Sequence, residues 1–430
     1  MQKKIKDKIP KPILKTMIFL REQCYVKPKK RKLFSNMQKK HKQLLQNIHS
    51  KEKIKVVFLV IHHSIWKVDP VFQSMLADPK FEPIILVCPY IIYGENRMWV
   101  DMKATYNYFK EKKYPLLSSY ITEEERWINL NELNPDILFF TNPHKLTRSE
   151  YYEDAYLSYL SCYVPYSHNI SKYNGYNSQY NQDFHNAMWL IFAPHDDDLE
   201  IFHQFSQRKK VNVFATGYPA CEALLSAQEK TVWKHQECKK LKIIWAPHHT
   251  IDTPELPYSN FIELASFFKE IAIKYKDNLQ FAFKPHPILK EKLYNHKDWG
   301  KDKTNSYYNY WDEQSNTQLE LGDYIELFKN SDAMIHDSGS FLAEYHYVRK
   351  PVFYICDESV KNYLNPFGIK ALSSCFQGKN CADIESFIQK LINNNISNNN
   401  VFFKNEIKPF FNSTTPSERI LKIIKDFITS

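Results

Sequence analysis

Residues 241–247 (LKIIWAP) are a short apolar run that ends in a proline. A run of this length and composition is typical of a strand that is buried on both faces of a sheet. Three similar runs follow it along the chain, at 279–285 (LQFAFKP), 332–336 (DAMIH) and 351–355 (PVFYI). Between them, helical periodicity is found near 259–275, 322–330 and 340–348. This alternation predicts a doubly wound parallel sheet.

The first half of the chain shows the same alternation. Its apolar runs lie at 53–61, 82–88, 136–140, 161–166, 188–193 and 211–216. Helices are expected between them at 69–78, 98–112 and 121–134. The sequence therefore predicts an α/β fold of two doubly wound, Rossmann-like lobes. Sheets of this kind bind ligands beyond the carboxyl ends of their strands.

Five segments are expected. They are a basic leader at 1–52, an N-terminal lobe at 53–218, a connecting helix at 219–240, a C-terminal lobe at 241–392, and an Asn-rich linker with a C-terminal helix at 393–430. The final helix, 416–429, is expected to fold back across the lobes.

Composition and charge exclude several classes of protein. The net charge is +10, but residues 1–53 carry 17 Lys and Arg against 3 Asp and Glu, which leaves 41 basic and 45 acidic residues in the remainder. A mildly acidic body has no positive field that would attract a nucleic acid. No apolar run approaches the roughly 20 residues of a membrane-spanning helix. The eight cysteines are scattered without a C-x-x-C pair, as is typical of reduced thiols in a cytosol.

The basic leader has a second possible role. The stretch 27–32 (KPKKRK) follows six apolar residues that a helix would place on one side: Ile9, Ile13, Leu14, Met17, Ile18 and Phe19. Basic residues beside a short apolar helix are typical of a segment that lies on an anionic membrane surface. A nucleic-acid patch and a solvated leader remain alternatives.

The eight glycines form neither G-x-G-x-x-G nor G-x-x-x-x-G-K, which argues against a dinucleotide-binding dehydrogenase and a P-loop NTPase. Asp337-Ser338-Gly339-Ser340 follows a predicted strand and opens a predicted helix. Backbone N–H groups and hydroxyls at such a position favour phosphate binding. The alternative is that Asp337 or Ser338 caps the helix.

Two further strand ends should reach the same rim. Lys284-Pro-His286-Pro follows the strand 279–283, and prolines on both sides of the histidine limit how far the loop relaxes. A lysine and a histidine held in this way suit a site that neutralises a leaving phosphate. The stretch 245–250 (WAPHHT) ends the first strand of this lobe and contributes Thr250.

Histidines also end strands in the first lobe. His168 follows 161–166, and its imidazole is the candidate proton acceptor for a hydroxyl group near neutral pH. His62 and His63 end the first strand in a comparable way. We expect one of the three to act as the base, and the others to be satisfied by backbone groups.

The stretch 193–200 (APHDDDLE) is similar to the metal-binding P-H-P-D-D-E segment of zinc-dependent N-acetylglucosaminyl deacetylases of the PIG-L type. Its second proline is missing, the following glycine pair is absent, and no H-x-x-H partner follows. The Asp-rich start of a helix explains the segment without a metal.

Taken together, the second half resembles the CDP-glycerol glycerophosphotransferase family, the teichoic-acid polymerases and primases, which have the two-lobed GT-B architecture. The matching stretches occur in the family's order: 216–219 (TGYP), 245–247 (WAP), 284–287 (KPHP), 331–340 (SDAMIHDSGS), Glu344 and 350–354 (KPVFY). This sequence departs from the family's motifs at three places. Residues 166–169 stand where the family has W-H-G-T-P, and Asp337-Ser-Gly-Ser340 stands where it has D-Y-S-S. His248-His249-Thr250 stands where the family has an arginine after W-A-P.

The resemblance implies roles for these residues. His286 would contact the donor diphosphate or protonate the leaving group. His168 would be the general base in an acceptor lobe. The donor phosphates would be held by Lys284, Thr250, Asp337, Ser338, Gly339 and Ser340, with Glu344 near the ribose.

The sequence thus predicts a cytoplasmic transferase, held at the inner face of the cell membrane by residues 1–52. It would move a glycerophosphate, polyol phosphate or sugar from a nucleotide-activated, CDP-linked donor to a lipid-linked or surface glycan. No cofactor, no metal and no nucleic acid are expected. A transferase of the same fold that uses a UDP-, GDP- or CMP-sugar for lipopolysaccharide or capsule is the alternative, and a zinc-dependent deacetylase is a third.

Overall fold

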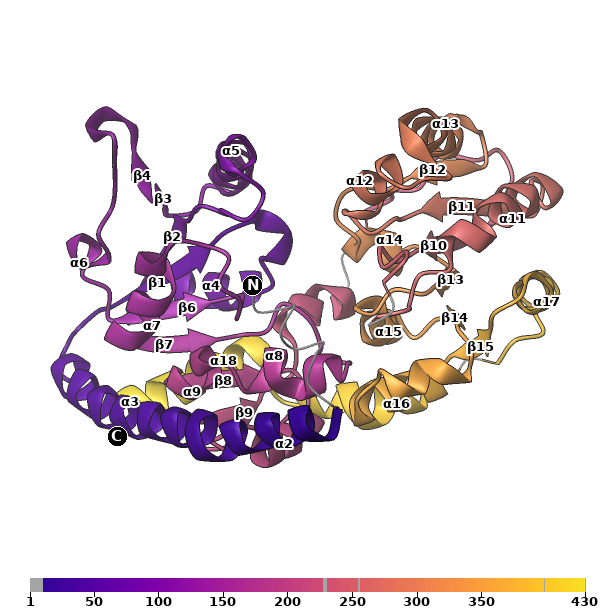
Figure 1. The fold of residues 1–430 in the computed structure, drawn as a ribbon. Coiled ribbons are helices and arrows are strands. Elements are labelled where there is room, and N and C mark those ends of the chain that lie inside the picture. Colours follow the sequence, from indigo (N-terminus) through magenta and orange to yellow (C-terminus); the bar gives the residue numbers. More distant parts are fainter. Residues whose placement is uncertain (1–10, 227–229, 254–255, 398, 430) are drawn as a thin grey trace. The chain divides into compact units, whose positions relative to one another are not determined.

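The computed structural model describes residues 11–226, 230–253, 256–397 and 399–429, and its contacts divide the chain into two compact units. Unit 1 consists of residues 1–166, 176–216 and 417–430. Unit 2 consists of residues 167–175 and 217–416. Each is built on its own parallel sheet with helices packed around it (Figure 1). The predicted α/β fold with two Rossmann-like lobes is confirmed.

The sheet of unit 1 has seven parallel strands in the order β3-β2-β1-β6-β7-β8-β9. The strands are β1 (Ile54–Val60), β2 (Phe81–Val87), β3 (Leu116–Ser118), β6 (Ile137–Phe140), β7 (Leu160–Tyr163), β8 (Leu190–Ala193) and β9 (Val213–Ala215). The central strands are buried along almost their whole length, which explains their continuous apolar sequences.

Unit 1 also contains helices. They are α2 (Lys11–Arg21), α3 (Lys27–Ile48), α4 (Asp69–Ala77), α5 (Glu95–Glu111), α6 (Leu130–Leu133), α7 (Glu153–Ser158), α8 (Asn177–Tyr180), α9 (Asp183–Ala187), α10 (Asp197–Phe205) and α18 (Pro416–Thr429). A π-helical turn, Glu22–Val26, joins α2 to α3. Helix α3 buries Met37 and Ile48, and α18 buries Ile420 and Ile424, so elements from both ends of the described chain complete this core.

The predicted helix at 121–134 is wrong. The segment forms a two-stranded hairpin, β4 (Tyr120–Ile121) with β5 (Arg126–Trp127), followed by the short helix α6. Glu125 has φ 51°, a left-handed conformation that interrupts a helix. Asn129 then starts α6 with a capping box to Glu132.

The sheet of unit 2 has six parallel strands in the order β12-β11-β10-β13-β14-β15. The strands are β10 (Leu241–Ala246), β11 (Leu279–Phe283), β12 (Thr317–Leu319), β13 (Ala333–His336), β14 (Val352–Ile355) and β15 (Phe376–Gly378). Its helices are α11 (Phe261–Lys274), α12 (Leu289–Tyr294), α13 (Gly300–Glu313), α14 (Ile325–Lys329), α15 (Phe341–Glu344), α16 (Pro366–Ser373) and α17 (Cys381–Ile392).

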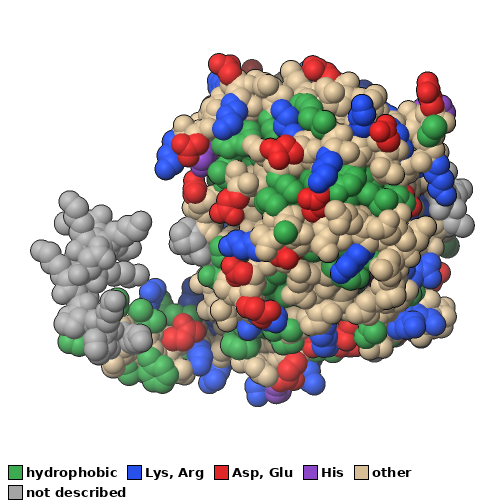
Figure 2. Space-filling view, turned by 90° about the vertical axis from the view of Figure 1, so that its right-hand side faces the viewer, with side chains coloured by type: hydrophobic (Ala, Val, Ile, Leu, Met, Phe, Trp, Pro, Cys, Tyr) green, Lys and Arg blue, Asp and Glu red, His purple; other side chains and the backbone are tan. Residues whose placement is uncertain are grey.

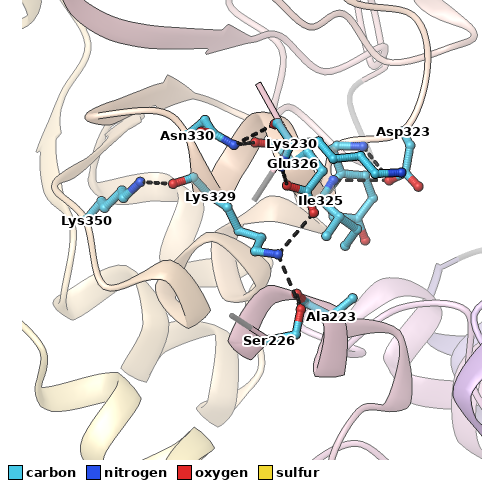
Figure 3. Close-up of polar contacts among 10 residues, drawn as sticks. Ala223, Ser226, Lys230, Asp323, Ile325, Glu326, Lys329, Asn330 and Lys350 are labelled. Atoms are coloured by element: carbon cyan, nitrogen blue, oxygen red, sulfur yellow. Dashed lines mark hydrogen bonds and ion pairs between the residues drawn. The ribbon is translucent and has the colours of Figure 1, made fainter. Parts of the chain in front are cut away.

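The expected connecting helix at 219–240 is also wrong. A 3-10 helix covers Pro219–Leu225, and the described residues 230–240 have irregular backbone. Side chains of unit 2 occupy the hydrogen-bonding groups that a helix would use: Glu326 accepts from Lys230 N–H, and Asn330 donates to Lys230 C=O (Figure 3). The Lys329 amine also bonds to Ser226 and Glu326. Tertiary contacts therefore override the helical pattern.

The strap, residues 167–175, belongs to unit 2 although the sequence suggested the first lobe. Ile170 C=O accepts from Asn365 N–H at 2.8 Å, and Lys172 N–H donates to Tyr363 C=O at 2.8 Å. A Cβ atom on Gly368 would lie 2.5 Å from the Ile170 oxygen, so the strap packs directly on the α16 backbone. A glycine is therefore required at position 368.

Buried neutral histidines make the fold sensitive to acid. Burial lowers the pKa of His336 to about 3 and that of His346 to about 4, against 6.5 in an unfolded chain. Below pH 6.5 the unfolded state therefore binds more protons than the folded state. As the pH is lowered, the free energy of unfolding decreases by up to about 1.4 kcal/mol per pH unit for each histidine. Burial raises the pKa of Asp337 to about 6, which offsets part of this loss below pH 6.

We expect urea titrations between about pH 7 and pH 5 to show a falling free energy of unfolding. His346→Gln should reduce this pH dependence, because the amide does not titrate. A stability that is constant or rises as the pH is lowered through this range would contradict the assignment of buried, neutral histidines.

Candidate functional site

Three strand ends of unit 2 bring the predicted C-terminal residues to one edge of the sheet. The strand β10 lies between β11 and β13, with Trp245 opposite Phe283 and Ala246 opposite His336. The loops after these strands are bonded to each other: His286 N–H donates to Pro247 C=O at 3.1 Å. The predicted common rim of 245–250, 284–287 and 337–340 is thus present within unit 2.

Three imidazoles meet at this edge. The ring centroids of His248 and His249 lie 4.4 Å apart, and His286 lies 5.2 Å from His248 and 4.2 Å from His249. All three side chains are half-buried. Burial, with the positive charge of neighbouring groups, lowers the pKa of His286 to about 3 and that of His249 to about 4. At neutral pH the cluster is therefore uncharged until an anion or a metal ion enters it.

Asp337 fixes the loop that carries two of these histidines. Its carboxylate accepts from His248 N–H and from Asn260 N–H, each at 2.6 Å, and from the Asn260 side chain at 3.2 Å. The group is buried, and burial raises its pKa to about 6. The observed contacts of Asp337 are thus those of a residue that positions the β10–α11 loop.

Lys284, Glu344 and Thr250 are buried around the same edge. The Lys284 amine donates to Gly322 C=O, and Glu344 is hydrogen-bonded to the Tyr324 hydroxyl. The Thr250 hydroxyl lies 2.9 Å from His248 Nδ1 and accepts from Ser259 N–H at 3.3 Å. Thr250 therefore orients His248.

The Ser338-Gly339-Ser340 stretch leads from β13 into α15. Ser338 is buried, whereas Ser340 is exposed at the N-cap position and makes no side-chain capping bond. The expected helix 340–348 is α15 followed by a 3-10 turn, Tyr345–Val348. The hydroxyl of Ser340 thus faces solvent next to the start of the helix.

His168 lies in the strap, within unit 2. It is 1% exposed, and its Nε2 atom lies 3.1 Å from the Tyr347 hydroxyl. Its ring also contacts Tyr218 and Phe367. The predicted role of His168 as a general base stays a prediction, and the observed surroundings are those of a residue that anchors the strap.

His62 and His63 end β1 in unit 1, as predicted. His62 Nε2 lies 4.0 Å from the buried carboxylate of Asp101, and its Nδ1 accepts from Ser64 N–H at 3.1 Å. Burial lowers the pKa of both histidines. His62 combines partial exposure with a carboxylate partner, a combination that suits a proton acceptor.

The deacetylase-like stretch 193–200 opens helix α10. His195 and Asp198 are both buried, with Nε2 and Oδ1 3.5 Å apart, and the Tyr180 hydroxyl donates to Asp198. Within the described residues, the group whose ligand atoms lie close enough together to hold a metal ion is His248, His249 and His286, which does not include this stretch. The helix-start interpretation accounts for the segment.

The sequence did not reveal which residues His248 and His249 contact. The sequence placed WAPHHT on the rim but assigned a role to Thr250 alone. Tyr258, which lies 5.6 Å from the His248 ring and next to Gly339, and Asn260, which binds Asp337, have no sequence signal of their own.

Comparison with known proteins identifies the family and agrees with the fold. Residues 166–424 match the family CDP-Glycerol:Poly(glycerophosphate) glycerophosphotransferase. A putative UDP-N-acetylglucosamine 2-epimerase from Listeria monocytogenes is 17% identical with a TM-score of 0.59, covering 87% of this chain and 96% of that one. A variant of the wall teichoic acid polymerase TagF is 14% identical with a TM-score of 0.53, covering 96% and 97%. A search of curated proteins gives no significant match.

The two Rossmann-like lobes and the family match define a transferase with the GT-B fold. The chain belongs to the CDP-glycerol:poly(glycerophosphate) glycerophosphotransferase family. No described helix is both long enough and apolar enough to cross a membrane.

Proposed function

We propose that the protein transfers a glycerophosphate or another polyol phosphate from a CDP-linked donor to a lipid-linked or surface glycan acceptor during the synthesis of a cell-envelope polymer. The observation that carries the proposal is the meeting of His248, His249 and His286 in a chain of this family, on a loop that Asp337 binds three residues before the exposed Ser340. Such a cluster offers ring N–H donors at the place where charge develops on a leaving nucleotide.

In this scheme the residues of unit 2 act mainly on the leaving group. The negative charge of a bound diphosphate raises the pKa of His286, so that the imidazole gains a proton and neutralises the departing phosphate. Ser340 donates to a phosphate oxygen, and the buried Lys284 adds positive charge. Asp337 and Thr250 hold the loop in position.

Attack by the acceptor hydroxyl requires a base. His168 is the residue that the family resemblance assigns, and His62 with Asp101 is the alternative that its surroundings favour. Comparing His168→Ala with His62→Ala separates the two: loss of the base lowers kcat by about 100-fold or more at unchanged donor affinity. If His168 only anchors the strap, His168→Ala lowers the free energy of unfolding instead.

The decisive experiment is a screen of donors. The purified protein is incubated with CDP-glycerol, CDP-ribitol, UDP-N-acetylglucosamine and CMP-linked sugars, and both thermal stabilisation and release of free nucleotide are measured. We expect CDP-linked polyols to stabilise the protein and to release nucleotide when a glycan acceptor is present. A response to nucleotide sugars alone would replace this proposal with an ordinary sugar transferase.

Gly339→Ala tests whether the donor approaches the backbone next to Ser340. A Cβ atom at this position would lie 3.7 Å from Ile170 and Tyr258, which is ordinary contact, so stability should change by less than about 0.5 kcal/mol. If the donor phosphates lie against this backbone, the added methyl group should weaken donor binding by roughly 10-fold. Calorimetric titration with CDP-glycerol measures the affinity. An unchanged affinity would place the phosphates elsewhere.

Membrane attachment is part of the proposal and rests on α2. Ile13 is 53% exposed and Phe19 is 61% exposed, among further exposed apolar side chains of this helix (Figure 2, lower left). The basic stretch 27–32 follows on α3. An apolar surface of this kind beside lysines favours an anionic lipid surface.

Ile13→Glu combined with Phe19→Glu should lower binding to phosphatidylglycerol vesicles by at least about 10-fold, because two exposed apolar side chains that would enter the lipid surface are replaced by carboxylates. Vesicle sedimentation measures the binding. Val100→Glu, on the exposed face of α5 at 62% exposure, is the matched control and should bind normally. Equal binding by all three proteins would contradict attachment through α2.

A further inference from the structure

We propose that His248, His249 and His286 form a binding site for one divalent transition-metal ion of the zinc type. One nitrogen from each imidazole lies within 4.8 Å of the other two. A tetrahedral zinc ion binds imidazole nitrogens at about 2.0–2.1 Å, which places neighbouring nitrogens about 3.4 Å apart. Rotation of the half-buried rings can bring the nitrogens from separations of up to 4.8 Å to this shorter separation.

The backbone that carries the three ligands is already fixed. Pro247 precedes the histidine pair, and Pro285 and Pro287 enclose His286, so each loop has restricted φ angles. His286 N–H is bonded to Pro247 C=O, and Asp337 holds His248 N–H at 2.6 Å. A metal ion therefore meets a backbone that is already in place, and only the imidazole rings have to turn on binding.

The surroundings of the rings fit a metal site. Thr250 Oγ1 lies 2.9 Å from His248 Nδ1 and orients that ring, as outer partners do for metal-bound histidines. His249 Nδ1 is buried without a hydrogen-bond partner among the described residues, and a metal would satisfy this nitrogen. His286 Nδ1 accepts a hydrogen bond from Ile288 N–H at 3.3 Å. This bond is long, and a bond from the imidazole to a metal ion could replace it.

The donor set also indicates which ion binds. Imidazole nitrogens favour Zn²⁺, Co²⁺, Ni²⁺ and Cu²⁺ over Mg²⁺ and Ca²⁺, which prefer oxygen ligands. Three protein ligands leave a fourth position for water or for an anionic oxygen. Lys284 and Lys292 lie near His286 and favour an anion in that position. If the proposed function holds, this anion is the donor diphosphate, and the ion, held by a neutral His286, takes the place of the protonated imidazole in neutralising it; the metal site itself does not depend on that function.

The test uses the full-length, untagged protein after treatment with a chelator. Titration with Co²⁺, followed by the visible absorption of tetrahedral cobalt, should saturate at one ion per chain, and Zn²⁺ should displace it while Mg²⁺ should not. His249→Ala and His286→Ala should each weaken Co²⁺ binding at least about 10-fold. His249→Gln provides a second variant if the alanine protein unfolds, and circular dichroism checks the fold of each.

His63→Ala is the matched control. The rings of His62 and His63 lie 4.4 Å apart, as do those of His248 and His249, but that pair is not part of a metal-site group among the described residues. Cobalt binding should be unchanged in this variant. Binding that survives in both His249→Ala and His286→Ala, or no binding by the intact protein, would overturn the proposal. Binding of inorganic pyrophosphate by the metal-free protein, with no uptake of Co²⁺, would identify an anion site instead and leave the proposed transferase function standing.

Discussion

His286→Ala is expected to lower turnover of a CDP-linked donor by about 100-fold to 10,000-fold while the protein remains folded. The ring belongs to the histidine cluster, where a positive charge or a ring N–H is needed as the nucleotide leaves. Its side chain is half-buried outside the apolar core, so removal should cost little stability. Release of free nucleotide measures turnover.

His286→Asn sharpens this experiment, because the amide can donate a hydrogen bond but cannot carry a proton charge. We expect the asparagine protein to bind donor better than the alanine protein and to remain slow. His235→Ala, an exposed histidine of the same unit, is the control and should retain full activity. Full activity in His286→Ala would remove this residue from the chemistry and count heavily against the proposed site.

Trp245→Ala is expected to destabilise unit 2 by about 3–5 kcal/mol, the usual cost of truncating a fully buried aromatic residue. Trp245 is 1% exposed and stacks on Phe268 at 4.0 Å and on Phe283 at 4.9 Å between ring centroids. It also lies in β10 three residues before His248, so loosening of the strand end should reduce donor binding as well. Urea unfolding followed by circular dichroism measures the change.

The control for this substitution comes from the same helix that carries Phe268. Ile273 of α11 is 60% exposed, and Ile273→Ala should change stability by no more than about 0.5 kcal/mol. If the two variants unfolded at the same urea concentration, the aromatic stack around Trp245 would not be the core of this unit.

The sequence predicted the central strands well, because a parallel strand buried on both faces must be apolar at every position. The runs 53–61 and 241–247 correspond to β1 and β10 within a residue or two at each end. Strands β3, β12 and β15 at the sheet edges were not predicted. Each of these strands has only three residues, so no periodic pattern can develop. In addition, most residues of β3 and β15 are only partly buried.

The helices show a different limit. The segment 219–240 has helical composition, but side chains more than eighty residues away satisfy its backbone, and no local pattern records that. The strap was placed in the wrong lobe for a similar reason: its position between β7 and α8 suggested unit 1, whereas Ile170 packs on Gly368.

For the site, strand ends were sufficient to place His286 and Asp337 on one edge. Their partners depend on the register of β10 against β11 and β13, which sets His248 beside Asp337 and brings the three imidazoles together. Register is a property of the folded sheet, and a single sequence does not reveal it.

Helix α18 has a consequence for synthesis on the ribosome. Ile420, Ile424 and Ile428 lie in the core of unit 1, but the ribosome adds them after the whole of the 217–416 segment has been made. The core of unit 1 is therefore complete only after all residues of the 217–416 segment have been synthesised. During translation, part of the apolar core of unit 1 therefore stays exposed until α18 has been synthesised.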